Sequence, residues 1–226
     1  MAIKKVKIKN FKCFKGLFEI ELNKGLNILV GNNESGKSTI LEAIHIALTG
    51  MYGGKNIRNE LSQYLFNRET VEAYIEAVNR GAALPPPAVC IEVFFEGSVD
   101  PEYEGNYNSD HAPFEGLRFE IAFDEKYSSE YNTLISKKEM LSLPIEYYEV
   151  SWASFARQAV TIRGVPVKSA LIDSSNYRYQ NGSDVYISRI VKDLLSPEEI
   201  TAVSQAHRKM KDTFIDDASI KAINDN

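Results

Sequence analysis

The alternation of apolar and polar side chains predicts several β-strands along this chain. Residues 5–9 and 18–22 alternate between apolar and charged positions, which is typical of half-buried strands, and the outer face of the first is basic. Residues 26–30, with the sequence Leu-Asn-Ile-Leu-Val, are mostly apolar, which suits a buried strand. Further apolar runs between polar loops predict strands at 89–95, 117–123, 145–150 and 167–172.

Apolar positions at helical spacing predict helices between these strands. Residues 40–48 are apolar on nearly all sides, which indicates a core helix that ends near Gly50. A second helical signal runs from about 57 to 80. Residues 196–199 (Ser-Pro-Glu-Glu) have the composition of a helix start, and the helix they open carries an apolar seam that needs a partner.

Composition and charge exclude several classes of protein. The chain has 226 residues, with 26 Lys and Arg against 31 Asp and Glu, so its formal net charge is −5. Its apolar runs are far shorter than the roughly 20 residues of a membrane helix, and the N-terminus lacks the apolar stretch of a secretory signal. Cys13 and Cys90 form no CxxC pair, which excludes a disulfide scaffold and a zinc ribbon. We therefore expect a cytoplasmic protein that does not contact a membrane.

The acidic balance limits how nucleic acid could bind. A mildly acidic chain has no bulk electrostatic attraction for DNA, so any contact must be local. Six lysines fall within residues 4–15, which contain no acidic residue. These lysines are the best candidates for DNA or phosphate, and an ordinary solvated strand face is the alternative interpretation.

One motif carries a specific chemistry. Gly31 and Gly36-Lys37-Ser38 match the pattern G-x-x-x-x-G-K-[ST] without a mismatch, between a predicted strand and a predicted helix. Glycines allow a tight loop whose backbone N–H groups approach phosphate oxygens, and the helix N-terminus favours an anion. Lys37 should neutralise the β- and γ-phosphates, and Ser38 should offer its hydroxyl to Mg²⁺. The sequence therefore predicts a nucleoside triphosphate site formed by Gly31, Asn32, Asn33, Glu34, Ser35, Gly36, Lys37, Ser38 and Thr39.

The surroundings of this loop favour one class of P-loop protein. The chain contains no Asn-Lys-x-Asp tetrad for guanine and no Arg-rich lid of a nucleotide kinase. In those classes the loop follows the first strand, whereas here two antiparallel-looking strands precede it. The residues that carry the match are Ile-Lys-Asn-Phe-Lys-Cys-Phe at 8–14, Leu-Asn-Ile-Leu-Val at 26–30 and Gly-Asn-Asn-Glu-Ser-Gly-Lys-Ser-Thr-Ile-Leu-Glu-Ala-Ile at 31–44. This arrangement resembles the ABC-type ATPases of DNA metabolism. That group includes the RecF, SMC and OLD (overcoming lysogenization defect) families.

The later sequence looks most like the N-terminal ATPase region of OLD-family ATP-dependent nucleases. The features that carry this likeness are the runs at 61–66, 91–95 and 144–148, Gly81 with the prolines that follow it, and Trp152 and Phe155. The resemblance implies that Lys12 lies beside bound ATP and that ATP binds between two ATPase heads, in a homodimer or a higher oligomer. It also implies a C-terminal Toprim domain that cuts DNA.

The same resemblance implies a glutamine that follows a strand and contacts Mg²⁺ and the attacking water. Gln180 stands at the right place for this role, and Gln158 is its rival. Arg178, close to the first of these, is interpreted either as a phosphate or DNA contact or as a surface ion-pair residue. The site predicted for ATP and Mg²⁺ thus contains Lys12 and Gln180 besides the loop, with Ser38 and Gln180 as metal ligands.

Motifs of the second half of such ATPases are missing from this sequence. The family carries a signature motif, a Walker B strand that ends in Asp-Glu and a switch histidine. The nearest match, residues 119–125, ends in Asp124-Glu125 but contains Glu120, so it alternates like a half-exposed strand. We therefore interpret Asp124 and Glu125 as structural residues, and we expect the chain to be an N-terminal piece of a longer enzyme or a truncated reading frame.

The histidines are interpreted as structural. His45 falls on the predicted core helix, His111 in a loop and His207 on the seam of the last helix. None has a second ligand at metal-binding spacing. The sequence therefore predicts no catalytic metal beyond the Mg²⁺ that accompanies the nucleotide.

The predicted fold is an α/β P-loop NTPase. It is the N-terminal lobe of an ABC-type ATPase, with a mixed sheet, antiparallel edge strands and a C-terminal helical segment. The lobe is expected at 1–183, with a helical insertion at about 55–83, and a helical arm begins at 184–226. Three functions remain open: part of an ATP-dependent DNA endonuclease of phage defence, a RecF- or SMC-like ATPase that holds DNA without cutting it, and a short nucleotide-binding regulatory module.

Overall fold

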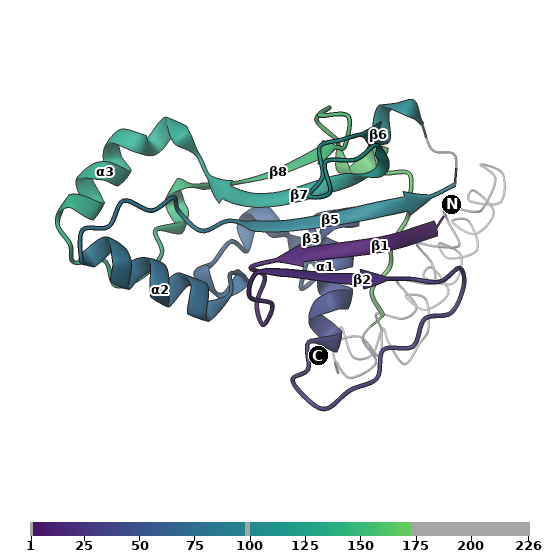
Figure 1. Ribbon diagram of the computed structural model, residues 1–226, viewed down its shortest axis with the longest axis horizontal. Helices are drawn as coiled ribbons and strands as arrows, with labels where there is room; N and C mark the ends of the chain where they lie inside the picture. The colour runs from purple at the N-terminus through teal and green to yellow at the C-terminus, as the bar shows by residue number, and fades with distance from the viewer. Residues whose placement is uncertain (1, 98–99, 173–226) are drawn as a thin grey trace, which may run out of the picture. The chain divides into compact units, whose positions relative to one another are not determined.

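An antiparallel sheet forms the centre of the computed structural model, which describes residues 2–97 and 100–172 (Figure 1). The strands run in the order β2-β1-β5-β7, and both β8 and the short β6 pair with β7. Their bounds are β1 (Ala2–Lys9), β2 (Leu17–Glu21), β5 (Val89–Glu96), β6 (Glu104–Gly105), β7 (Phe114–Phe123) and β8 (Tyr148–Ser154). A separate hairpin consists of β3 (Met51–Tyr52) and β4 (Lys55–Asn56), and the described α-helices are α1 (Lys37–Thr49), α2 (Arg68–Asn79) and α3 (Ser128–Ser136).

Alternation places one side of each long strand in the core. Val6 of β1 is fully buried and lies opposite Ile20 of β2 and Val93 of β5. Ile8 repeats this arrangement two residues later. Because successive side chains of a strand point to opposite faces, these rows form one continuous apolar surface. The strands predicted at 5–9, 18–22, 89–95 and 117–123 are therefore confirmed.

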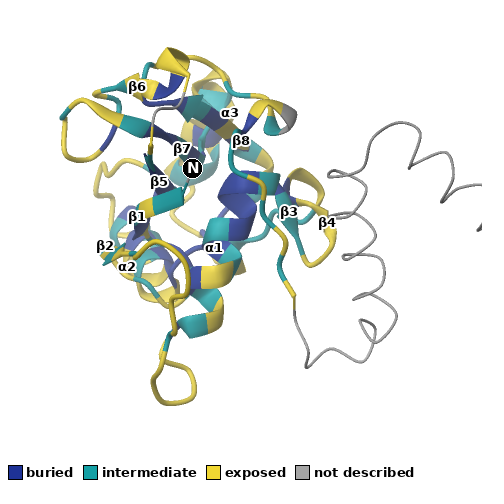
Figure 2. Cartoon of the chain, turned by 90° about the vertical axis from the view of Figure 1, so that its right-hand side faces the viewer, coloured by how far each residue is buried: buried dark blue, intermediate teal, exposed yellow. Residues whose placement is uncertain are grey.

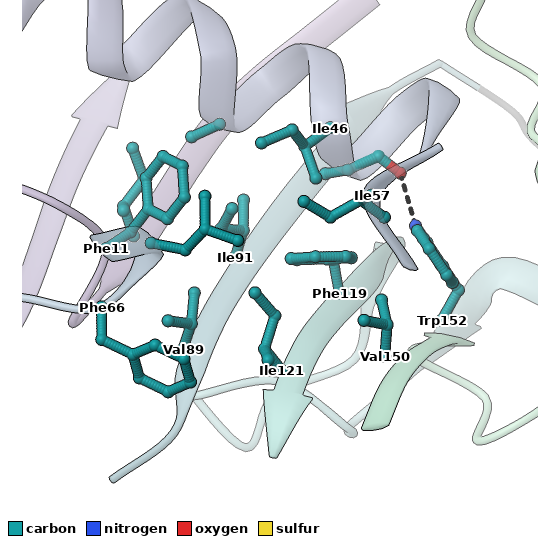
Figure 3. Packing of buried hydrophobic residues seen from close by; sticks show 14 of the residues in the cluster. Phe11, Ile46, Ile57, Phe66, Val89, Ile91, Phe119, Ile121, Val150 and Trp152 are labelled. Atoms are coloured by element: carbon teal, nitrogen blue, oxygen red, sulfur yellow. Dashed lines mark hydrogen bonds between the residues drawn. The ribbon is translucent and has the colours of Figure 1, made fainter. Parts of the chain in front are cut away.

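Helix α1 covers the apolar face of the sheet (Figure 3). Ile46 of the helix is buried with Ile91 of β5 and Phe119 of β7. Trp152 of β8 also reaches the helix, where its indole N–H donates to the carbonyl of Ala47 at 3.1 Å. The burial of this apolar surface stabilises the fold and holds α1 against the sheet. The glycine-rich loop lies at the N-terminus of this helix, so the sheet also fixes the position of the loop.

The opposite face of the sheet buries charged residues. Lys7 of β1 is buried and forms ion pairs with Asp110 and Glu19, and buried Glu92 of β5 lies 3.0 Å from the guanidinium of Arg118. Burial disfavours the charged ammonium of Lys7, but its hydrogen bonds with the two carboxylates outweigh this effect and raise its pKa. The prediction of a basic outer face at residues 5–9 is therefore wrong at Lys7, which is buried and whose charge is neutralised by the two carboxylates.

Asn67 joins the start of α2 to the loop between β1 and β2. Its Oδ1 accepts a hydrogen bond from the Thr70 N–H at 3.1 Å, which is the N-cap contact preferred by asparagine. Its Nδ2 donates to the carbonyl of Lys12 at 2.9 Å. The helix of this insertion is shorter than predicted, because residues 51–66 form the β3–β4 hairpin and two 3₁₀ turns, Ile57–Asn59 and Gln63–Leu65.

Residues 26–30 do not form the predicted buried strand. Leu26, Ile28 and Val30 are 83%, 73% and 87% exposed, and the segment pairs with no strand in the described part of the chain. Figure 2 colours the chain by burial, and the stretch between β2 and α1 is mostly exposed. A strand buried on both faces needs neighbours to bond its backbone groups and layers to cover its side chains. No such neighbour lies within 2–97 and 100–172. Every strand pairing there is antiparallel, so the parallel part of the predicted mixed sheet is not seen among these residues.

Other elements also differ from the prediction. In the segment predicted as a strand at 145–150, a 3₁₀ turn occupies Ile145–Tyr147 and β8 begins only at Tyr148, since short apolar runs do not distinguish turns from strands. Residues 167–172 form no strand, and α3 was not predicted. The predicted domain boundary at 183 and the helix from Ser196 lie outside the described residues. No helix within the described residues is long and apolar enough to span a membrane.

Candidate nucleotide-binding site

The glycine-rich loop leads directly into α1. Gly36 adopts a left-handed backbone conformation, with φ 88°, just before Lys37 begins the helix. The first backbone N–H groups of a helix have no acceptor within it, and here the N–H of Ile40 is the first to return, to the carbonyl of Gly36 at 3.0 Å. The loop therefore presents N–H donors at the positive end of the helix dipole, as phosphate binding requires.

Lys37 reaches back across this loop. Its ammonium donates to the carbonyls of Gly31 at 2.8 Å and Asn32 at 2.6 Å, and to the hydroxyl of Ser35 at 3.3 Å. A Cβ at Gly31 would lie only 2.7 Å from that hydroxyl, so the loop is compact. Phosphate oxygens carry more negative charge than carbonyl oxygens and bind an ammonium more strongly. The residues of the loop therefore fit a polyphosphate, which would take over the contacts of Lys37.

The loop between β1 and β2 forms the second wall of the site. Lys12 and Cys13 line a pocket of about 450 Å³ together with residues 33–39. The two loops touch at Gly36, where a Cβ would lie 2.8 Å from the Phe14 ring and 3.0 Å from the sulfur of Cys13. The structure thus brings Lys12 into one pocket with the glycine-rich loop.

An ion pair connects Lys12 with α1. Its Nζ lies 2.5 Å from Oε2 of Glu42, and it also stands 4.8 Å from the ring centroid of Tyr52. Burial disfavours the charged ammonium, but the hydrogen bonds with Glu42 and Tyr52 outweigh this and raise the pKa of Lys12. Lys12 therefore remains a cation at neutral pH, at the edge of the pocket.

Ser38 and Thr39 occupy the first turn of α1 and line the same pocket. Ser38 is exposed, so its hydroxyl is accessible to a cation held by phosphate oxygens. Within the described residues there is no group of three or more His, Cys, Asp or Glu side chains that could hold a metal ion by itself. The donor set would fit Mg²⁺ only in company with a nucleotide, and Ser38 is the side chain that would then hold the ion.

Several other predicted residues lie away from this pocket. Asp124 caps the 3₁₀ turn Glu125–Tyr127 and forms an ion pair with Lys126, at the end of a strand whose pairings are antiparallel. Gln158 is exposed in the turn after β8, where its backbone bonds with Ser154. Neither residue lines the pocket. The structural interpretation of Asp124 agrees with these contacts, and Gln180 and Arg178 lie outside the described residues.

The described histidines do not line the pocket. His45 is buried on α1, where its Nδ1 lies 3.3 Å from the Ser169 hydroxyl, and burial lowers its pKa. His111 is exposed in the loop before β7. His207 lies outside the described residues.

Sequence reasoning missed Glu42, Tyr52 and Cys13, all of which lie at the edge of the site. Glu42 follows Ser38 by four residues, and this spacing places both on the same side of a helix. This spacing could have identified Glu42 as a neighbour of the loop, but Glu42 lies in a run of apolar residues that indicates only a core helix. Tyr52 comes from the β3–β4 hairpin, which the sequence pattern does not predict.

Parts of this chain are similar in sequence to curated proteins. The DNA replication and repair protein RecF of Clostridium kluyveri is 36% identical over 97 residues, which are 43% of this chain and 25% of that protein. The DNA double-strand break repair Rad50 ATPase of Methanopyrus kandleri is 50% identical over 46 residues, 20% of this chain and 5% of that protein. This chain therefore spans a quarter or less of the length of these relatives.

A solved structure and a family model also resemble this chain. A structure from work on ATP-driven dimerization and DNA-stimulated activation of SMC ATPases aligns over 91% of this chain and 98% of its own, with a TM-score of 0.40 and 16% identity. The family model described as an AAA domain matches residues 5–145, more than half of the chain and all of the glycine-rich loop. The chain therefore belongs to the AAA domain family.

Proposed function

We propose that this chain binds MgATP at residues 31–39 and serves as the nucleotide-binding lobe of a DNA-processing ATPase. The observation that carries the proposal is the geometry of the loop, in which Lys37 spans the oxygens of Gly31, Asn32 and Ser35 at the N-terminus of α1. An ammonium, a row of backbone N–H groups and a helix dipole converge on one point. That combination binds polyphosphates.

The proposal gives a separate task to three residues of the loop. Lys37 exchanges its carbonyl partners for the β- and γ-phosphate oxygens, and the backbone N–H groups around Gly36 bond the remaining phosphate oxygens. Ser38 holds Mg²⁺, which neutralises phosphate charge when bound. Because the sequence shows no Walker B strand and no signature motif, we expect this chain alone to bind ATP and to hydrolyse it slowly.

The names of the relatives suggest DNA as a partner. RecF and Rad50 are named for DNA replication and repair, and the chain covers only part of each. We propose that the full-length protein acts on DNA and that two copies enclose the nucleotide between them. The described surface offers DNA fewer free cations than the sequence suggests, because Lys5 and Lys7 both pair with Asp110.

The finer assignment concerns what happens to the DNA. The likeness to OLD-family nucleases favours an endonuclease, with phage defence as the biological setting. A RecF- or SMC-like ATPase that holds DNA is the alternative, and a short regulatory module is a third possibility. Incubation of the full-length gene product with plasmid DNA, Mg²⁺ and ATP separates them: cleavage supports the nuclease, whereas retention of intact DNA supports the alternative. A native product of about this length that shows neither would support the regulatory module.

The first test of ATP binding is the Lys37→Ala variant. Charge-assisted hydrogen bonds contribute about 1.5–3 kcal/mol each, so we expect affinity for MgATP to fall by about 10- to 100-fold. Equilibrium titration with a fluorescent ATP analogue in the presence of Mg²⁺ measures the effect.

The matched control is Lys55→Ala, which also removes one lysine. Lys55 is exposed and pairs with Glu60, and it is not among the residues that line the pocket. We expect its affinity for MgATP to equal that of the unmodified chain. Equal loss in both variants, or no binding to the unmodified chain, would contradict the proposed site.

A further inference from the structure

Both cations that line the pocket already have anionic or carbonyl partners. Lys37 is bonded by oxygens of its own loop, and Lys12 is paired with Glu42 at 2.5 Å. Any polyphosphate that enters must therefore replace protein oxygens at each ammonium. The two replacements differ in kind, because Lys37 gives up neutral carbonyl groups, whereas Lys12 gives up a carboxylate.

The structure confines the exchange at Lys12 to its side chain. The Lys12 N–H donates to the carbonyl of Leu65 at 3.0 Å, and its own carbonyl accepts from Asn67 at 2.9 Å. Phe11, its neighbour, is fully buried. The backbone is thus fixed at both hydrogen-bonding groups, while the four-carbon side chain is free to change partners. Glu42 is likewise fixed in position by α1.

Charge decides how strongly a ligand competes for this ammonium. The Lys12 and Glu42 side chains are 24% and 29% exposed, so solvent screens their ion pair only in part. A ligand that brings little charge near Lys12 leaves the pair intact. A ligand with an additional phosphate offers oxygens of comparable charge and can take the ammonium over.

We infer that Glu42 and the terminal phosphate of the nucleotide compete for Lys12, so that Glu42 restrains ATP binding and the exchange distinguishes ATP from ADP. This inference rests on the proposed function of the glycine-rich loop. Glu42 is then a positioning residue that acts through Lys12. In the nucleotide-free state it holds the ammonium at the pocket edge, and in the ATP-bound state it releases it.

Binding of MgATP and MgADP to the full chain, to Glu42→Gln and to Lys12→Met tests this exchange. The amide of glutamine keeps the shape of the side chain and removes its charge. We expect Glu42→Gln to tighten ATP binding about fivefold and to change ADP binding less than about twofold, as fits loss of one partly exposed ion pair. Lys12→Met should weaken ATP binding selectively. Isothermal titration provides each Kd, and thermal melts report whether each variant is folded.

The double variant Lys12→Met/Glu42→Gln separates exchange from a general effect of charge. Without Lys12, the Glu42→Gln change should no longer tighten ATP binding. If it still does so by the same factor, the carboxylate acts on the nucleotide directly and the exchange is refuted. Unchanged or weaker ATP binding by Glu42→Gln alone would also refute it.

Two further measurements complete the experiment: a matched control variant, and ATP binding that depends on Lys37. Glu72→Gln removes an exposed carboxylate that pairs with Arg68 on α2, and it should leave both affinities unchanged. Binding that depends on Lys37 but does not respond to Glu42→Gln would overturn this inference and leave the ATP site in place. No ATP binding to the unmodified chain would overturn both.

Discussion

Valine in place of Gly36 is expected to weaken MgATP binding by more than about a hundredfold. Gly36 is buried with φ 88°, a conformation that a β-branched residue adopts only under strain. Its Cβ would lie 2.8 Å from the Phe14 ring and 3.0 Å from the Cys13 sulfur. Strain and overpacking each cost about 1–3 kcal/mol, and together they would displace the loop from the helix N-terminus.

Gly25→Val is the matched control for this change. Gly25 has nearly the same backbone angle, φ 89°, but nothing lies within 4 Å of the Cβ that would be added there. Both variants carry similar backbone strain, so a difference in ATP affinity reports the contact between the two loops. Titration with a fluorescent ATP analogue measures it. Comparable affinities for both valine variants would show that this contact does not shape the site.

Alanine in place of Phe119 is expected to lower the free energy of unfolding by about 4 kcal/mol, the middle of the range for buried aromatic residues. Phe119 is fully buried on β7, and its ring centroid lies 5.0 Å from that of Trp152, which is itself bonded to α1. Truncation leaves a cavity between the sheet and the helix. For a unit of this size the melting temperature should fall by about 10 °C.

Phe114→Ala provides the comparison on the same strand. Phe114 is 38% exposed and contacts the ring of Phe94 at 5.6 Å between centroids. Its loss should cost about 1 kcal/mol or less, because water already reaches the ring. Urea unfolding followed by circular dichroism gives both values. If the two variants were equally destabilised, the core would not lie where the structure places it.

The central antiparallel strands could be predicted because each carries its own signal. In β1, Val6 and Ile8 alternate with lysines and are buried, and β7 alternates in the same way from Leu117, whereas β5 is recognised by its mostly apolar run of residues. The segment 26–30 shows the limit of this reasoning. Its apolar side chains reveal a tendency to be buried, but burial needs a neighbouring element, and the pattern within a segment does not say whether one is present.

The candidate site shows the same limit, because only its locally encoded residues could be predicted. Residues 31–39 could be predicted because one local pattern contains the glycines, Lys37 and Ser38. The partner of Lys12 could not, because Glu42 is 30 residues away and meets it only when the β1–β2 loop folds against α1. The burial of Lys7 was missed for the same reason, since Asp110 is 103 residues away.

Position 67 has an unusually narrow chemical requirement. The asparagine there accepts a hydrogen bond from Thr70 on one side and donates to the carbonyl of Lys12 on the other. A carboxylate of the same size could serve the helix but would repel that carbonyl, and a hydroxyl is too short to reach both. One amide group therefore ties the start of α2 to the β1–β2 loop that lines the candidate nucleotide pocket, so a change of residue at this position would disturb both.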